Sequence, residues 1–110
     1  MPSFDKSVRL RKRVDFLSVA SSGRKLYLPD FIIVKADSKL SWPRIGITVS
    51  RKVGNSVNRN RIKRLVREFF RNNRELFLSA DYNIIARSGA VNLGFDDVCQ
   101  ELANGLCRIG

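Results

Sequence analysis

The segment from residue 51 to residue 74 constrains the fold of this chain more than any other. Its apolar residues recur every three or four positions, which is the period of a helix with one buried face. That stripe consists of Ile62, Leu65, Val66, Phe69, Phe70 and, in the same row, Asn73. The opposite side of the helix, within an arc of about 100°, carries Asn60, Lys63, Arg64, Arg67, Arg71 and Arg74. The segment holds nine Arg or Lys residues and one acid, Glu68, so a helix over 56–74 would pack one face on a core and present cations on the other.

A strand is predicted to lead into this helix. Apolar residues alternate with small or polar ones over 45–53, which is the period of two of a half-buried strand. Gly54-Asn55-Ser56 then breaks the strand, and its Asn or its Ser can cap the helix. The free amides of the first helical turn lie beside Arg59, Asn60 and Arg61, so this end of the helix is suited to binding an anion.

The charge of the chain narrows the class of its partner. It has 110 residues, 21 Lys or Arg against 10 acids, and a formal net charge of +11. Such a chain attracts polyanions, so nucleic acid is the first candidate partner and an anionic membrane the second. A membrane is disfavoured because no apolar run approaches the ~20 residues of a spanning helix. Residues 1–13 lack the apolar stretch of a signal peptide, which favours a cytoplasmic location, and the length suits one domain, residues 1–110.

The sequence argues against a protein-borne active site. Phosphodiester hydrolysis by a protein needs converging carboxylates to hold metal ions, or a histidine or lysine as acid or base. The chain has no histidine, and its adjacent acids, Asp96 and Asp97, are better explained as stabilising a helix N-terminus. Cys99 and Cys107 would lie about 12 Å apart on one helix, too far for a disulfide, and they are too few for a zinc site. We therefore predict no catalytic residue, no metal site and no protein-bound cofactor, and we expect both cysteines to be free thiols, with Cys99 in the core.

The remaining segments predict a small mixed fold. Residues 1–12 form a basic arm, either solvated and flexible or settled on RNA. A short helix is expected over 14–22. A strand over 26–36, bent or begun at Pro29, is expected to pair with 45–53 as an antiparallel hairpin. A central strand around 81–87 would run parallel to 45–53, and a helix over 94–108 closes the chain.

Two features of these segments allow both a structural and a functional interpretation. Phe16 points away from Val14 and Leu17 on the short helix, so its ring either packs in the core or offers a face on which an RNA base stacks. The small side of the second strand, Gly46, Thr48 and Ser50, either faces solvent or lets an RNA strand lie close.

The run from Lys52 to Glu68, Lys-Val-Gly-Asn-Ser-Val-Asn-Arg-Asn-Arg-Ile-Lys-Arg-Leu-Val-Arg-Glu, resembles the Arg-Asn-Arg signature of the bacterial ribonuclease P protein subunit. The resemblance extends over almost the whole chain, including Arg9-Leu10 before Asp15-Phe16 and Asp81-Tyr82 before Ile84–Arg87. It implies an α+β two-layer sandwich of the ribosomal protein S5 domain 2-like type, with element order αβββαβα. In that family the βαβ crossover is left-handed, against the general rule.

The resemblance also implies a function. These proteins are the small subunit of a ribonucleoprotein endonuclease that removes the 5′ leader of precursor tRNA, and Mg²⁺ at the RNA active site carries the chemistry. The protein alone is not expected to be catalytic: it binds the catalytic RNA and the single-stranded leader, broadens substrate use and lowers the metal demand. Carried over by position, the contacts to the catalytic RNA and its phosphates would be Arg51, Lys52, Arg59, Asn60, Arg61, Lys63, Arg64, Arg67 and Arg71. The leader cleft would be lined by Phe16, Ala20, Phe31, Ile33, Thr48 and Lys52.

Two departures from the family pattern concern this cleft. Ala20 and Val34 stand where aromatic residues are common in the family, so the cleft would be shallower or its leader preference different. A ribosomal or other structural RNA-binding protein fits the same basic α/β pattern. A sequence-specific DNA-binding protein fits it less well, because beyond Asn60 the basic face lacks base-reading residues.

Overall fold

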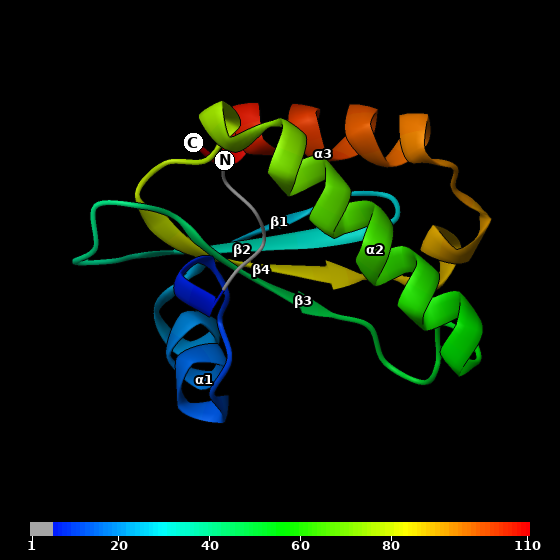
Figure 1. Cartoon of the computed structure of the whole chain (residues 1–110), viewed down its shortest axis with the longest axis horizontal. Coiled ribbons are helices and arrows are strands. Elements are labelled where there is room, and N and C mark those ends of the chain that lie inside the picture. Colours follow the sequence, from blue (N-terminus) through cyan, green and yellow to red (C-terminus); the bar gives the residue numbers. More distant parts are fainter. Residues whose placement is uncertain (1–5) are drawn as a thin grey trace.

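The computed structural model describes residues 6–110, which form one four-stranded sheet and three α-helices (Figure 1). In chain order the main elements are α1 (Arg13–Ser22), β1 (Arg24–Tyr27), β2 (Phe31–Asp37), β3 (Arg44–Thr48), α2 (Ser56–Asn72), β4 (Ala80–Ala86) and α3 (Phe95–Ile109). Short 3-10 turns lie at Lys6–Val8, Arg74–Leu76 and Ser88–Asn92. The predicted α+β class and the order αβββαβα are confirmed.

The strands are arranged in the order β1-β2-β4-β3. β3 runs parallel to β4, with Ile47 opposite Ile84, as predicted. β2 pairs antiparallel with β4, with Ile33 opposite the same Ile84. The predicted hairpin between the second and third strands is therefore wrong, because β4 lies between them. Nearly all of β4 is buried, which suits the central position of a covered sheet.

Three predicted boundaries also differ from the structure. The expected strand over 26–36 is two strands, β1 and β2, and Pro29 lies in the turn between them, which is closed by a 2.8 Å bond from Leu28 N to Phe31 O. β3 ends at Thr48, because a turn follows in which Val53 N donates to Ser50 O at 3.1 Å. α2 ends at Asn72, so Arg74 belongs to the next turn and not to the helix.

The main core lies between the sheet and the helices α2 and α3, which both cover one of its faces (Figure 1). Four residues of the predicted apolar stripe of α2, Ile62, Val66, Phe69 and Phe70, are almost fully buried there. Phe77 adds edge-on ring contacts to Phe70 and Tyr82, with centroids 4.9 and 5.0 Å apart. The predicted division of α2 into an apolar and a cationic side is thus confirmed.

The opposite face of the sheet carries a smaller apolar cluster under α1, which packs toward one end of that face (Figure 1). Val19 of α1 meets Val34 and Ala36 of β2 there, and Phe16 and Ile85 pack against the same cluster. Because α1 is short, it leaves part of this face of the sheet uncovered by helix.

The segment before α1 is attached to the edge of the sheet. Leu10 N donates to Ile45 O at 3.0 Å, and the indole Nε1 of Trp42 donates to Ser7 O at 2.8 Å. Val8 and Leu10 are buried at 5% exposure each. Val8 and Leu10 therefore hold this part of the basic arm against the sheet, while residues 1–5 lie outside the described part of the chain.

The ends of α2 and α3 follow the predicted capping chemistry. The side chain of Asn55 accepts a bond from Asn58 N at 2.9 Å, which caps α2. Asp97 accepts from Gly94 N at 3.0 Å, so this acid stabilises the start of α3 as expected. Cys99 is half-buried at the border of the core and Cys107 is exposed, and both are free thiols.

Candidate nucleic-acid interface

The cationic side of α2 faces outward and is open to a partner. The exposed members of the predicted RNA-binding set are Arg51, Lys52, Asn60, Arg64 and Arg71. Its half-buried members are Arg59, Arg61, Lys63 and Arg67. The set is therefore distributed between an outer row of solvated side chains and an inner row that contacts the rest of the protein.

Several of these cations also make contacts within the chain. Arg59 Nε donates to Gly54 O at 3.2 Å, and Arg61 Nη2 donates to Leu93 O, which ties α2 to the segment before α3. Arg71 pairs with Glu68, the acid of this helix, at 2.6 Å. Arg74 lies over the ring of Phe70 at 5.0 Å from its centroid, a cation–π contact outside the helix. Arg61 thus has a structural role beside any role in binding RNA.

A basic pocket opens where α1, the segment before it, β3 and α2 meet. Its volume is about 140 Å³. The lining residues are Arg9, Leu10, Arg11, Phe16, Ile45, Gly46, Ile47, Lys63 and Arg67. Four of these residues are cations, two from the N-terminal segment and two from one side of α2, and none is acidic. Such a pocket is suited to a phosphate group with an aromatic ring beside it.

Phe16 lies directly on Gly46, which explains why β3 has a glycine at this position. A Cβ on Gly46 would stand 2.4 Å from Cε1 and 2.7 Å from Cζ of the Phe16 ring, closer than atoms approach. The ring is half-buried: it packs on the small apolar cluster and also lines the basic pocket. Both interpretations of Phe16, as a core residue and as an open aromatic surface, therefore describe part of its environment.

The other predicted cleft residues divide between the two faces of the sheet. Thr48 shares the face of Gly46 and is exposed, and Ala20 is exposed on α1. Lys52 is exposed in the turn beyond β3. Phe31 and Ile33 do not line this face: both are 0% exposed in the main core under α2 and α3. Their assignment to the leader cleft is wrong, because successive residues of a strand point to opposite faces.

Asn83 is a residue of this face that sequence reasoning missed. It lies in β4 opposite Gly46 and Val34, is 8% exposed, and accepts a 3.0 Å hydrogen bond from the hydroxyl of Thr48. Its signal in the sequence is a single amide side chain inside the otherwise apolar run from Tyr82 to Ala86.

Arg44 joins α1 to the sheet. Its Nε and Nη2 donate to Asp81 of β4 at 2.9 and 2.7 Å, and its Nη1 lies 3.7 Å from Asp15 of α1. The hydrogen bonds to Asp81 raise the pKa of Arg44 further above its ordinary value. Because Asp15 precedes Phe16, this pair of contacts helps to fix the helix that carries the ring.

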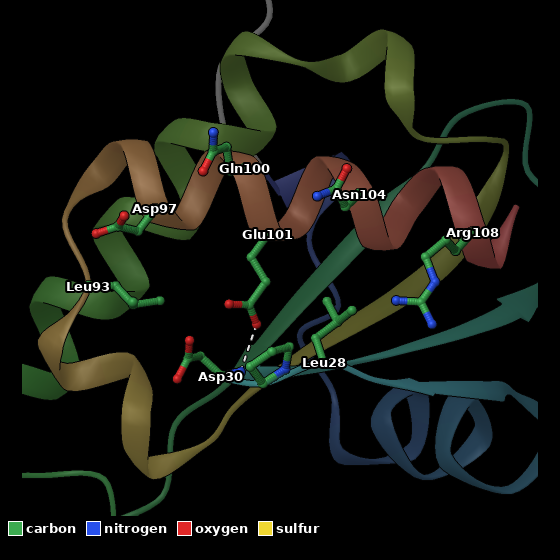
Figure 2. Close-up of a pocket in the computed structure, with 9 residues that line it drawn as sticks. Leu28, Asp30, Leu93, Asp97, Gln100, Glu101, Asn104 and Arg108 are labelled. Atoms are coloured by element: carbon green, nitrogen blue, oxygen red, sulfur yellow. Dashed lines mark hydrogen bonds between the residues drawn. The ribbon is translucent and has the colours of Figure 1, made fainter.

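A second, larger pocket of about 360 Å³ lies between α3 and the turn that joins β1 to β2 (Figure 2). Glu101 Oε2 accepts from Asp30 N at 2.7 Å, the contact dashed in Figure 2. Burial, together with the neighbouring Asp30, raises the pKa of Glu101 above its usual range. Asp97 also lines this pocket. With three carboxyl groups, from Asp30, Asp97 and Glu101, and one cation, Arg108, the pocket is unsuited to nucleic-acid phosphates.

The described residues contain neither a group of metal ligands nor a membrane-spanning helix. Residues 6–110 contain no group of three or more His, Cys, Asp or Glu side chains placed to hold a metal ion. Across the same range, no helix is both long enough and apolar enough to cross a bilayer.

Comparison with known proteins agrees with this geometry. The chain matches the family model described as Ribonuclease P over residues 4–110. It is 49% identical over 107 residues to the ribonuclease P protein component of Geotalea uraniireducens, which covers 97% of this chain and 95% of that protein. The corresponding component of Syntrophus aciditrophicus is 46% identical over 98 residues, with 88% and 82% covered.

Solved structures of such proteins have the same fold. The RNase P protein of Thermotoga maritima in complex with 1-(4-fluorophenyl)-2-thiourea is 36% identical and superposes with a TM-score of 0.86 over 93% of this chain and 100% of that one. A Staphylococcus aureus RNase P protein mutant with defective mRNA degradation activity is 30% identical, with a TM-score of 0.88 over 96% and 92%. From the match along nearly the whole sequence and the shared fold, we conclude that this chain belongs to the ribonuclease P protein family.

Proposed function

We propose that this chain is the protein subunit of a ribonuclease P holoenzyme, which cleaves the 5′ leader from precursor tRNA in the cytoplasm. The exposed row of α2 binds the catalytic RNA, and the sheet face under α1 binds the single-stranded leader. Mg²⁺ ions held by the RNA carry the cleavage, while the protein adds binding energy for the substrate, broadens the range of substrates and lowers the metal demand. Family membership supports the assignment to ribonuclease P.

The observation that carries the proposal is the basic pocket beside Phe16. Lys63 and Arg67 of α2 line this pocket, and so does the ring of Phe16 from α1. One concave surface therefore offers cations for phosphates and an aromatic ring for a base. A single strand of RNA needs both, since its backbone is charged and its bases are unstacked. The acidic lining of the larger pocket leaves this side of the molecule as the better RNA surface.

The electrostatic part of the proposal has a measurable signature. Each phosphate neutralised by a cation releases condensed counterions, and the slope of log affinity against log salt concentration changes by about −0.7 to −0.9 per contact. Arg64 is the best test, because it is exposed on the cationic side of α2. Arg108 is the matched control, because it is exposed on α3 beside the acidic pocket.

We expect Arg64→Gln to weaken binding to the cognate ribonuclease P RNA and to reduce the salt slope by about 0.7–0.9. Arg108→Gln removes the same charge and should change neither quantity, and both variants should unfold at the wild-type temperature. If the two variants lose affinity equally, the attraction depends on net charge alone and α2 is not the binding surface.

The leader part of the proposal depends on Phe16. In a holoenzyme reconstituted from the protein and its RNA, Phe16→Ala should weaken binding of leader-bearing precursor tRNA by about 5- to 100-fold, the equivalent of losing one stacked base. Binding of leaderless tRNA should not change. Equal losses for both substrates would exclude Phe16 from the leader site, and cleavage of precursor tRNA by the pure protein would contradict the whole proposal.

A further inference from the structure

Asn83 is a buried amide on the face of the sheet that carries α1, with apolar Val34 on one side and Gly46 on the other. Val34 is 1% exposed, and Phe16 packs on the same cluster. An apolar side chain would pack better here, so the amide calls for an explanation beyond the stability of the fold.

One half of the Asn83 carboxamide has a partner and the other half does not. The hydroxyl of Thr48 donates to Oδ1 at 3.0 Å, which orients the group. Among the described residues, Nδ2 takes part in no hydrogen bond, and it is not one of the fully enclosed polar atoms. Although 92% of Asn83 is covered, its two N–H donors therefore point toward the surface of this face, where an acceptor from a partner can reach them.

The surroundings of these donors suggest the class of acceptor. Gly46 is next to Asn83 and has no side chain, and the Phe16 ring lies on it. Phe16 and Gly46 also line the basic pocket with its four cations, so a base that stacks on Phe16 beside Asn83 would have its phosphates within reach of that pocket. An uncharged amide donor suits an uncharged base oxygen better than a phosphate.

We infer that Asn83, oriented by Thr48, is a specificity-determining residue that donates a hydrogen bond to a keto oxygen of an unpaired RNA base. The inference rests on the proposed function of this face as the leader site. The acceptors that discriminate are O4 of uracil and O6 of guanine, because cytosine and adenine carry an amino donor at those positions. O2 is common to uracil and cytosine and cannot tell them apart. Because Thr48 occupies Oδ1, the amide discriminates mainly through its donors, and uracil or guanine is favoured at the base that contacts Phe16.

The test uses the reconstituted holoenzyme and precursor tRNAs whose leaders differ by one nucleotide at a time. The wild type should show one leader position at which uracil or guanine binds about five- to tenfold tighter than adenine or cytosine, the effect of one hydrogen bond. Asn83→Val should reduce that spread to within about twofold, and its thermal stability should not fall, because a donor that is unpaired within the chain is removed.

Thr48 provides the matched pair of variants. Thr48→Val keeps the shape of the exposed side chain but removes the hydroxyl that orients the amide, so it should reduce the discrimination. Thr48→Ser keeps the hydroxyl and should retain it. This pair carries the same test if Asn83→Val fails to fold.

The results separate the inference from the proposal beneath it. If the wild type prefers leader-bearing substrate but binds all four bases equally at every leader position, the inference fails and the proposed function stands. If Asn83→Val or Thr48→Val keeps the full spread, the inference fails as well. If the wild type does not distinguish leader-bearing from leaderless tRNA, the proposed leader site fails, and the inference fails with it.

Discussion

Replacing Gly46 by alanine tests the geometry of the Phe16 site directly. The added Cβ would lie 2.4 Å from Cε1 and 2.7 Å from Cζ of the ring, and 3.1 Å from Cδ1 of Leu10. Carbon atoms pack at about 3.5–4.0 Å, so the ring must withdraw by about 1 Å or α1 must shift with it. Leu10 is 5% exposed and leaves little room on the other side.

The expected cost follows from these distances. Overpacking a filled site costs about 1–3 kcal/mol, and alanine recovers about 0.5–1 kcal/mol over glycine within a strand. We therefore expect Gly46→Ala to lower the free energy of unfolding by about 1–2 kcal/mol. Displacing the ring should also weaken the binding of leader-bearing precursor tRNA by up to about 100-fold, which corresponds to the loss of one stacked base. The binding of leaderless tRNA should not change.

A double-mutant cycle with Phe16→Ala shows whether the ring is the cause. Unfolding is followed in urea, and affinity is measured for leader-bearing and leaderless substrates in the reconstituted holoenzyme. Once the ring is gone, adding Gly46→Ala should cost little in stability and nothing further in leader affinity. If Gly46→Ala lowers the free energy of unfolding equally with and without the ring, the strain does not come from the ring. If Gly46→Ala alone keeps full stability and full leader affinity, Phe16 does not pack on Gly46 as described.

Two further predictions concern charged groups away from Gly46. Asp81→Ala should lower the free energy of unfolding by about 2 kcal/mol, because it leaves the half-buried Arg44 without its two-bond partner. Glu68→Ala breaks the exposed pair with Arg71 and should lower the free energy of unfolding, measured in urea, by well under ~1 kcal/mol. If Asp81→Ala and Glu68→Ala lose equal stability, the contact of Arg44 with Asp81 is no stronger than a surface pair. Burial and Asp30 raise the pKa of Glu101 above its ordinary value of 4.5, so its favourable contribution is complete below that value and is lost as pH rises through the folded-state pKa. Glu101→Gln can still accept from Asp30 N, so its stability relative to wild type should increase between pH 4 and pH 7. A difference that is the same at both pH values would show that folding does not raise the pKa of Glu101.

The helix α2 could be predicted from sequence almost completely, because its apolar period and its cap are local signals. Ile62 and Phe69 are buried where the period places them, and Asn55 caps the first turn. The end of the helix was less certain: Arg74 continues the cationic row in sequence, yet it turns away after Asn72 and lies on Phe70. Local pattern indicates which face is buried better than it indicates where an element stops.

Strand neighbours and strand faces could not be predicted in the same way. β2 is apolar on both sides, so alternation alone does not say whether Phe31 or Ile32 meets the helices. The answer depends on α2 and α3, which lie far along the chain. For the same reason the hairpin prediction was wrong, since nothing near β2 and β3 in the sequence shows that β4 lies between them.

The charged residues of the candidate site could be predicted from the sequence, whereas the residues whose position depends on burial could not. The cations of α2 were found, whereas Arg9 and Arg11 were placed in a basic arm, either flexible or settled on RNA, and its attachment to the sheet was not predicted. Val8 and Leu10 alternate with them, and that short period of two is the signal that this segment lies along the edge of β3. Asn83 was missed because one amide in an apolar strand carries no motif.

The central place of β4 bears on how the protein is made. β2 and β3 have no direct contact with each other along the sheet and depend on residues 80–86 to join them. On the ribosome, β2 and β3 therefore have open strand edges until residues 80–86 emerge. A nascent chain stalled before residue 80 would keep these edges open, and we expect chaperones and proteases to recognise it.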